Sequence, residues 1–212
     1  MILTSNIELP EPVQPSQLQP LVPATPRGEA TRRKLMAAAE AEFGAKGFHI
    51  ASVSSITTRA GVGQGTFYLY FRTKDEIFVT LVKEIGRSLR KHMRDAVAGA
   101  RDRIEAERHA YEAFFEFASG HPGLYRIVQE SQFVDPTVYR DYYERIASGY
   151  SEDLQAAAAR GEIRPGDAEV RAWALMGVGH FLGLRHCLWE GKAPSTEVID
   201  SMMDLVANGL KK

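Results

Sequence analysis

Residues 52–74 have the sequence SVSSITTRAGVGQGTFYLYFRTK, in which glycines separate two short segments of helical pattern. Ser52 is placed to cap a helix over residues 53–60, because a serine side chain accepts hydrogen bonds from the free backbone amides at a helix start. Gly61 interrupts the pattern, and a second helix is expected over residues 64–71. Two short helices joined by a glycine-containing turn indicate a helix-turn-helix.

The residues at the start of this second helix suit contact with DNA. A major groove is about 12 Å wide, so a helix that enters it needs small or polar side chains at its exposed N-terminal end. Gln64, Gly65 and Thr66 meet this requirement, because glutamine can pair with an adenine edge and a threonine methyl can contact thymine. Tyr68 and Tyr70 are expected to reach phosphate oxygens through their hydroxyl groups.

The next helix is expected to begin at Lys74. Thr73 and Glu76 match a capping box, in which each side chain accepts a hydrogen bond from the other residue's amide. Lys74 then stands at a helix N-terminus, where the helix dipole and the free amides attract phosphate. We therefore expect Lys74 to contact the DNA backbone.

Charge is unevenly distributed along the chain, although the formal net charge is only −1. Residues 27–74 contain eight basic and three acidic side chains, whereas residues 75–212 contain 18 basic and 22 acidic ones. A basic module on an acidic body is typical of nucleic-acid-binding proteins.

Residues 30–82 resemble the DNA-binding domain of the TetR family of regulators. The resemblance rests on FGAKGF at 43–48, VSSI at 53–56, AGV at 60–62, GTFYLYF at 65–71 and KDEIF at 74–78. It implies a homodimeric, all-helical regulator, usually a repressor, that a small ligand releases from a palindromic operator. By position it supports the DNA contacts named above and adds Ser52 as a residue that can touch phosphate. Gly63 stands where the family commonly has a serine or threonine cap, and Tyr70 where it frequently has histidine.

The remaining sequence predicts helices throughout, and no alternating pattern predicts a strand, so the expected fold class is all-α. The expected helices span residues 28–46, 74–100, 103–120, 124–133, 136–161, 167–190 and 195–210. The predicted organisation has three parts, which are a flexible proline-rich arm at 1–26, a helix-turn-helix DNA-binding domain at 27–76, and a ligand-binding and dimerisation domain at 77–212.

Aromatic residues are frequent in the C-terminal part, where a cavity among packed helices would suit an apolar, aromatic or acyl ligand. The candidate pocket residues are Tyr111, Phe115, Tyr125, Gln129, Tyr143, Trp173 and His180. For each of them, a place in the hydrophobic core is the alternative.

The last two expected helices carry wide apolar stripes interrupted by glycines, which permit close helix approach. We expect them to form a four-helix bundle with a second copy of the chain. The candidate interface residues are Trp173, Gly177, Phe181, Leu184, Met202, Leu205 and Val206. The alternative is that these stripes face only their own subunit.

Several other functions are not supported by the sequence. Cys187 is the single cysteine, which favours a reducing compartment, and no secretory signal or membrane-length apolar run is present, so a cytoplasmic location is expected. No HExxH or GxGxxG pattern occurs, so no metal, cofactor or catalytic activity is expected. A helical protein-interaction module with a vestigial DNA-binding fold remains the competing hypothesis, and salt-dependent DNA binding would distinguish the two.

Overall fold

The computed structural model describes residues 15, 21, 23 and 25–210, and every regular element in these residues is a helix. The prediction of an all-α fold is confirmed. The expected arm over residues 1–26 lies, apart from a few positions, outside the described residues. Its boundary is one residue too long, because Pro26 already forms the first position of a helix whose start is capped by Thr25.

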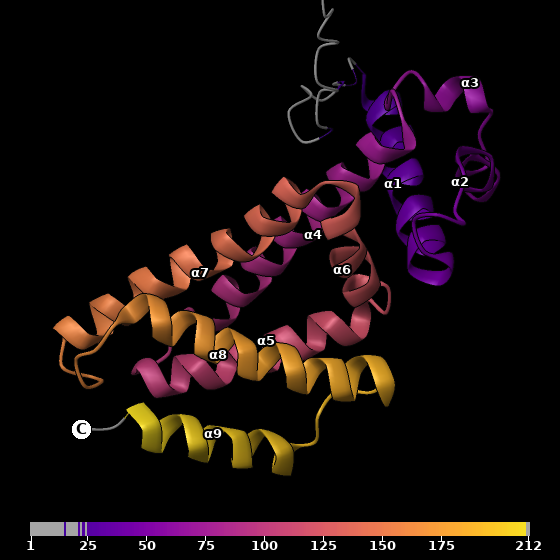
Figure 1. The fold of residues 1–212 in the computed structure, drawn as a ribbon. Helices are drawn as coiled ribbons and strands as arrows, with labels where there is room; N and C mark the ends of the chain where they lie inside the picture. The colour runs from indigo at the N-terminus through magenta and orange to yellow at the C-terminus, as the bar shows by residue number, and fades with distance from the viewer. Residues whose placement is uncertain (1–14, 16–20, 22, 24, 211–212) are drawn as a thin grey trace, which may run out of the picture.

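The helices follow one another with short connections (Figure 1). Their bounds are α1 Pro26–Lys46, α2 Val53–Ala60, α3 Gln64–Phe67, α4 Lys74–Val97, α5 Arg103–Gly120, α6 Leu124–Val134, α7 Pro136–Ala159, α8 Ala168–Gly183, the π-helix η2 Leu184–Trp189, and α9 Thr196–Leu210. Helices α1, α2 and α3 form a small domain at one end of the molecule, and α4 runs from this domain into the larger body (Figure 1).

Local capping determines where most helices begin. The Thr73 hydroxyl accepts a hydrogen bond from the Glu76 amide at 3.0 Å, and Asp135 caps α7 directly before its proline. The predicted capping box at α4 is only half formed, because the Glu76 carboxylate accepts from the backbone amide and the guanidinium of Arg72 instead. The Glu76 carboxylate therefore bonds to the amide of Arg72, one residue before Thr73, whose amide the pattern predicted as its donor.

Several predicted helix ends were wrong by a few residues or in helix type. Helix α4 ends at Val97, before the left-handed Gly99, and α7 ends at Ala159, before the left-handed Gly161. The helix expected to reach residue 190 changes to a π-helix after Gly183. Periodicity locates a helix well but does not determine its terminal hydrogen bonds.

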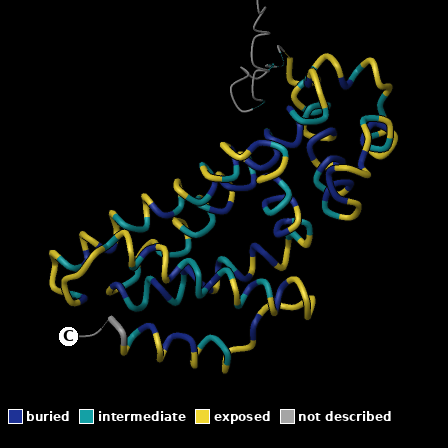
Figure 2. The backbone as a smooth tube through the Cα atoms, in the orientation of Figure 1, coloured by how far each residue is buried: buried dark blue, intermediate teal, exposed yellow. Residues whose placement is uncertain are grey.

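The body is built around α4, α5, α7 and α8, with α9 packed against α5 (Figure 1). Figure 2 shows that buried residues follow one side of the long helices. In the small domain, Phe43 of α1 meets Phe78 of α4 edge to face, with ring centroids 4.9 Å apart. Since α4 carries core residues of both parts, it fixes the small domain to the body.

A buried carboxylate also holds the small domain together. The Glu42 side chain on α1 is only 3% exposed, and it accepts hydrogen bonds from Lys46 Nζ at 2.6 Å and Arg59 Nε at 2.7 Å. These bonds, first from Lys46 and then from Arg59, lower the pKa of Glu42 to about 2. Because Arg59 belongs to α2, the ion pair fixes the helix-turn-helix against α1.

We expect Glu42→Gln to lower the free energy of unfolding by about 1 kcal/mol at neutral pH, because an amide replaces two charge-assisted hydrogen bonds whose donors are half exposed. A depressed native pKa stabilises the fold above the unfolded value near 4.5, and this contribution is lost as the pH falls towards 2. Urea denaturation from pH 7 to pH 2 should show the difference from the wild-type chain shrinking over that window. A difference that stayed constant with pH would contradict this role for Glu42.

Candidate nucleic-acid interface and effector cavity

The first helix of the helix-turn-helix, α2, begins and ends at the residues that the sequence predicted. The Ser52 hydroxyl accepts a hydrogen bond from the Ser55 amide at 3.1 Å, and the Ser55 hydroxyl accepts one from the Ser52 amide at 3.1 Å. Gly61 ends α2 in the left-handed region, with φ 67°. Gly63 precedes α3 without a side-chain cap, as its missing side chain predicts.

Helix α3 is shorter than predicted, because it ends at Phe67 rather than Phe71. The amides of Leu69 and Tyr70 bond to carbonyl groups three residues back, so the chain tightens into a turn after one helical turn. Phe67 and Phe71 are nevertheless both buried, as expected, and their rings lie 5.7 Å apart. Two buried anchors on either side of the turn hold residues 68–70 at the surface.

The predicted DNA contacts differ in exposure. Gln64 and Gly65 are exposed and Tyr68 is 54% exposed, whereas Thr66 and Tyr70 are partly buried. We call Gln64, Gly65, Thr66 and Tyr68 the recognition surface. Leu69 is 70% exposed beside this surface and was not among the predicted contacts.

Lys74 has an internal role that the sequence analysis did not predict. Its Nζ donates hydrogen bonds to the carbonyl oxygens of Phe48 at 2.7 Å and Ala51 at 3.0 Å, and it lies 4.2 Å from the centre of the Phe48 ring. Lys74 therefore holds the segment that leads into α2. An ammonium group has three donors, so one remains for the predicted phosphate contact.

Helix α6 holds the small domain at the same segment. The Glu130 carboxylate accepts a hydrogen bond from the Phe48 amide at 2.6 Å, and Arg126 Nη1 donates to the carbonyl oxygen of Ala45 at 2.7 Å. Gly44 and Gly123 pack backbone to backbone, since a Cβ built on Gly44 would lie 2.9 Å from the Cα of Gly123. We call these contacts the α1–α6 junction.

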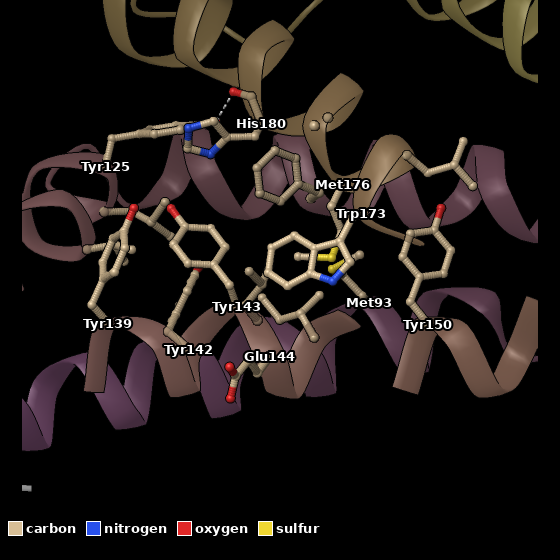
Figure 3. Close-up of a pocket in the computed structure, with 18 of the residues that line it drawn as sticks. Met93, Tyr125, Tyr139, Tyr142, Tyr143, Glu144, Tyr150, Trp173, Met176 and His180 are labelled. Atoms are coloured by element: carbon tan, nitrogen blue, oxygen red, sulfur yellow. Dashed lines mark hydrogen bonds between the residues drawn. The ribbon is translucent and has the colours of Figure 1, made fainter. Parts of the chain in front are cut away.

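A cavity of about 720 Å³ lies in the body, with walls from α4, α5, α6, α7 and α8 (Figure 3). Five of the seven predicted pocket residues line it, and these are Tyr111, Tyr125, Tyr143, Trp173 and His180. The volume is in the range of small-molecule binding sites.

Phe115 and Gln129 do not line this cavity. Phe115 is 1% exposed and belongs to the core behind the wall, where its ring lies 5.5 Å from that of Phe114, which does line it. On α6, the polar wall residue is Gln132, and Gln129 lies to the side of the stripe that Gln132 shares with Val128. The sequence predicted α5 and α6, but it did not predict which side of each helix faces the cavity.

Other wall residues were missed. Tyr139 and Tyr142 join Tyr143 on α7, and Met93 of α4 and Met176 of α8 lie near Trp173 (Figure 3). The spacing of the α7 residues is helical and could have identified Tyr139. Met93 gave no local signal, because only the packing of α4 brings it to the cavity.

Tyrosine hydroxyl groups tie the cavity walls to one another. Tyr111 donates to the carbonyl oxygen of Leu175 at 2.9 Å, and Tyr125 donates to that of His180 at 3.2 Å. Gly183 leaves room for Tyr125, because a Cβ there would overlap the Tyr125 hydroxyl group. Burial raises the pKa of Tyr125 and lowers that of His180, so both side chains are uncharged at neutral pH.

An ion pair is buried behind one end of the cavity. Arg103 Nε donates to the Glu107 carboxylate at 2.7 Å, and the hydroxyl group of Tyr150, a wall residue, donates to the other carboxylate oxygen. Burial raises the pKa of Glu107, which the charge of Arg103 and the bond from Tyr150 oppose. The pair fixes Tyr150 between α5 and α7.

The predicted dimer residues divide into three groups by exposure. Trp173 is 43% exposed, Phe181 68% and Leu205 68%, so an apolar face of α8 and α9 is open to solvent. Gly177 and Leu184 are half-buried. Met202 and Val206 are each only 5% exposed and pack in the core of their own subunit, although Met202 also lines a groove with Phe181 and Leu205. Helix α9 turns this side towards α5.

Comparison with known proteins agrees with the helix-turn-helix. Residues 35–81 match the model of the family described as bacterial regulatory proteins, tetR family. The uncharacterized HTH-type transcriptional regulator YdgC of Bacillus subtilis is 43% identical over 65 residues, which are 31% of this chain and 33% of that protein. The HTH-type transcriptional activator FasR of Mycolicibacterium smegmatis is 32% identical over 109 residues, which are 51% of this chain and 49% of that protein. The chain thus spans a third to a half of the length of these relatives.

Solved structures extend the likeness of fold to the body. The fatty acid degradation regulator FadR from Bacillus halodurans superposes with a TM-score of 0.73 at 19% identity, covering 87% of this chain and 96% of that one. GusR of Salmonella enterica superposes with a TM-score of 0.72 at 20% identity, covering 84% and 94%. At these identities the likeness shows the fold alone.

The described residues contain neither a membrane-spanning helix nor a metal-binding cluster. No helix in them is long and apolar enough to cross a membrane. The same residues contain no group of three or more His, Cys, Asp or Glu side chains arranged to hold a metal ion.

We expect Glu130→Ala to speed amide hydrogen exchange in residues 47–51, because the Phe48 amide loses its acceptor, and to cost about 1–2 kcal/mol of stability. Exchange measured by mass spectrometry would test this. Glu130→Gln keeps an acceptor oxygen and is the matched control, which should remain close to the wild-type chain. Equal exchange in all three proteins would show that the α1–α6 junction does not depend on this bond.

Proposed function

We propose that the chain is a regulator of the TetR family and that it controls transcription by binding a palindromic DNA operator as a homodimer. The recognition surface carries this proposal. Gln64 at the start of α3 and Tyr68 directly after its end are exposed, while Phe67 is fully buried and anchors the helix in the core. A major groove accepts a helix end of this kind.

Phosphate contacts would position the domain around these base contacts. Ser52, Tyr70 and Lys74 are the proposed phosphate ligands, together with the hydroxyl group of Tyr68. Tyr70 lies beside the start of α1, since a Cβ built on Gly28 would be 3.4 Å from its hydroxyl oxygen. The free amides of a helix start favour an anion at the same place.

A homodimer would place two recognition surfaces on one operator. The exposed apolar face of α8 and α9, with Phe181 and Leu205 both 68% exposed, is the proposed interface. Large apolar side chains in one region of a surface favour association. A two-fold axis there would present two α3 helices to successive major grooves, which are about 34 Å apart.

The proposed effector is a small apolar, aromatic or acyl molecule bound in the cavity. The walls are rich in aromatic and aliphatic side chains, and only a few polar groups face the interior. One structural neighbour is described as a fatty acid degradation regulator, which is consistent with an acyl ligand.

Two helices connect the cavity to the DNA-binding domain. Helix α6 contributes Tyr125 and Val128 to the wall and Glu130 to the α1–α6 junction, while α4 contributes Met93 to the wall and Lys74 to the same segment. A ligand that binds more tightly to one arrangement of these helices shifts the population towards it. In the proposed mechanism, that arrangement separates the recognition surfaces and releases the operator, so the protein acts as a repressor.

Selection of binding sites from a random double-stranded DNA pool tests the proposal. We expect an enriched palindrome, and Gln64→Ala should weaken its binding roughly tenfold because a base contact is lost. Tyr68→Phe should weaken all sequences more evenly. Tyr139→Phe, the same chemical change in the cavity, is the control and should leave DNA affinity unchanged. A reporter gene that fell silent when the protein was deleted would instead indicate an activator.

Salt dependence separates this function from that of a helical protein-interaction module. Binding to the selected palindrome should weaken steeply as salt increases, because phosphate contacts release counterions. Absence of an enriched sequence, or binding that did not change with salt, would favour the protein-interaction module.

We expect Phe181→Glu to convert the dimer to a monomer, because a charge would be buried at the proposed interface. Sedimentation velocity would measure the change, and affinity for the palindrome should fall at least tenfold with the loss of the second half-site. Phe133→Glu is the matched control, since Phe133 is 78% exposed on α6, away from this face. A dimer that survived Phe181→Glu would place the interface elsewhere.

A further inference from the structure

We propose that the cavity binds an uncharged amphipathic molecule, with a carbonyl or hydroxyl group beside Tyr139, Tyr143 and His180 and an apolar chain or ring against Trp173. This inference deepens the proposed function, because it takes the cavity to be the effector site. It follows from how polar and charged groups are distributed over the walls.

The polar groups gather at one end. The Tyr143 ring centre lies 5.2 Å from that of Tyr139 and 6.2 Å from that of His180, and His180 lies 5.3 Å from Tyr125. Figure 3 shows these four side chains together on one side of the cavity, from α6, α7 and α8. A ligand therefore meets its hydrogen-bonding partners at this end.

Only some of these groups are free to bind a ligand. The hydroxyl group of Tyr125 already donates to a backbone carbonyl, whereas the rings of Tyr139 and Tyr143 meet edge to face with centres 5.2 Å apart. A phenolic hydroxyl group can donate one hydrogen bond and also accept. Among the described residues, no protein group forms a hydrogen bond with the His180 ring. The cavity thus offers a hydroxyl donor and an imidazole, which suit a carbonyl or hydroxyl group.

The walls offer no net charge to a ligand. Arg140 and Glu144 are the charged wall residues, and they have opposite sign, lie one turn apart on α7 and are exposed. Behind the walls, Arg103 and Glu107 neutralise each other, and the guanidinium of Arg90, which lies near Tyr142, is partly exposed to solvent. Burial lowers the pKa of His180, so its ring does not supply a positive charge at neutral pH. A buried carboxylate or ammonium group would therefore lack a counter-charge, which is costly.

Apolar side chains are concentrated beyond the tyrosine–histidine end. Met93, Trp173 and Met176 lie together between the tyrosine–histidine end and Tyr150 (Figure 3). The hydroxyl group of Tyr150 is bonded to Glu107 and is not free for a ligand. Thioether and indole side chains accommodate alkyl and aromatic groups of varied shape.

Fluorescence of Trp173 provides the test. The chain has two tryptophans, and Trp189 is 71% exposed, so a Trp189→Phe background leaves Trp173 as the only reporter. Four probes share a ten-carbon length, namely methyl decanoate, 1-decanol, decanoate and decylammonium. At neutral pH, we expect both neutral probes to bind at least about tenfold more tightly than either ion. Equal or tighter binding of decanoate or decylammonium, or no response to any probe, would overturn the inference.

Substitutions test the polar end. Tyr143→Phe removes one hydroxyl group and should weaken the neutral probes roughly three- to tenfold, with little effect on the ions. Thr31→Val removes a hydroxyl group that bonds only within α1, and it should leave all four affinities unchanged. If Tyr143→Phe left all four affinities unchanged, the polar group of the ligand would not lie at this end.

The ligand-binding test and the DNA-selection test can fail independently of each other. A protein that selects a palindrome but prefers decanoate would remain a regulator with an anionic effector. If the protein binds methyl decanoate but selects no DNA sequence, the proposed ligand class stands and the proposed regulatory function fails.

Discussion

The close contact between Gly44 and Gly123 is the constraint on which the arrangement of the two domains depends. Because neither residue has a side chain, α1 and the start of α6 approach backbone to backbone, and Arg126 and Glu130 can then reach the segment that leads into α2. Lys74 holds the same segment from the other side. The helix-turn-helix is thus held by the two helices that also line the cavity, so a change in the cavity walls has a direct route to it.

Features that depend on neighbouring residues could be predicted from the sequence. Ser52 and Asp135 cap the helices that they were expected to cap, because capping needs only a side chain and the next two or three amides. Features that depend on distant packing could not. Phe115 and Met202 were assigned to functional surfaces because both are large and apolar, but the rotation of α5 and α9 turns them into the core. Aromatic composition predicts that a cavity can exist, and tertiary packing selects which aromatic residues face it.

The buried ion pairs of the two domains differ in how far their charged groups reach solvent. In the small domain, the Glu42 carboxylate is buried but its partners reach solvent, which keeps its pKa near 2. In the body, Arg103 and Glu107 are both enclosed, and burial raises the pKa of the carboxyl group. Such enclosed pairs contribute more to a single defined arrangement than to net stability. This one fixes the position of Tyr150 and with it one end of the cavity.

Gly183 also bears on how this chain could be adapted to a new effector. Most wall residues belong to side chains that could be exchanged for others of different size, which would reshape the cavity locally. A side chain at position 183 would instead displace Tyr125 and break its bond to α8. Tyr125 belongs to α6, the helix of the α1–α6 junction. Libraries that reshape the proposed effector site should therefore vary Met93 and Met176 and leave position 183 as glycine, since a side chain there would disturb α6 as well as the cavity.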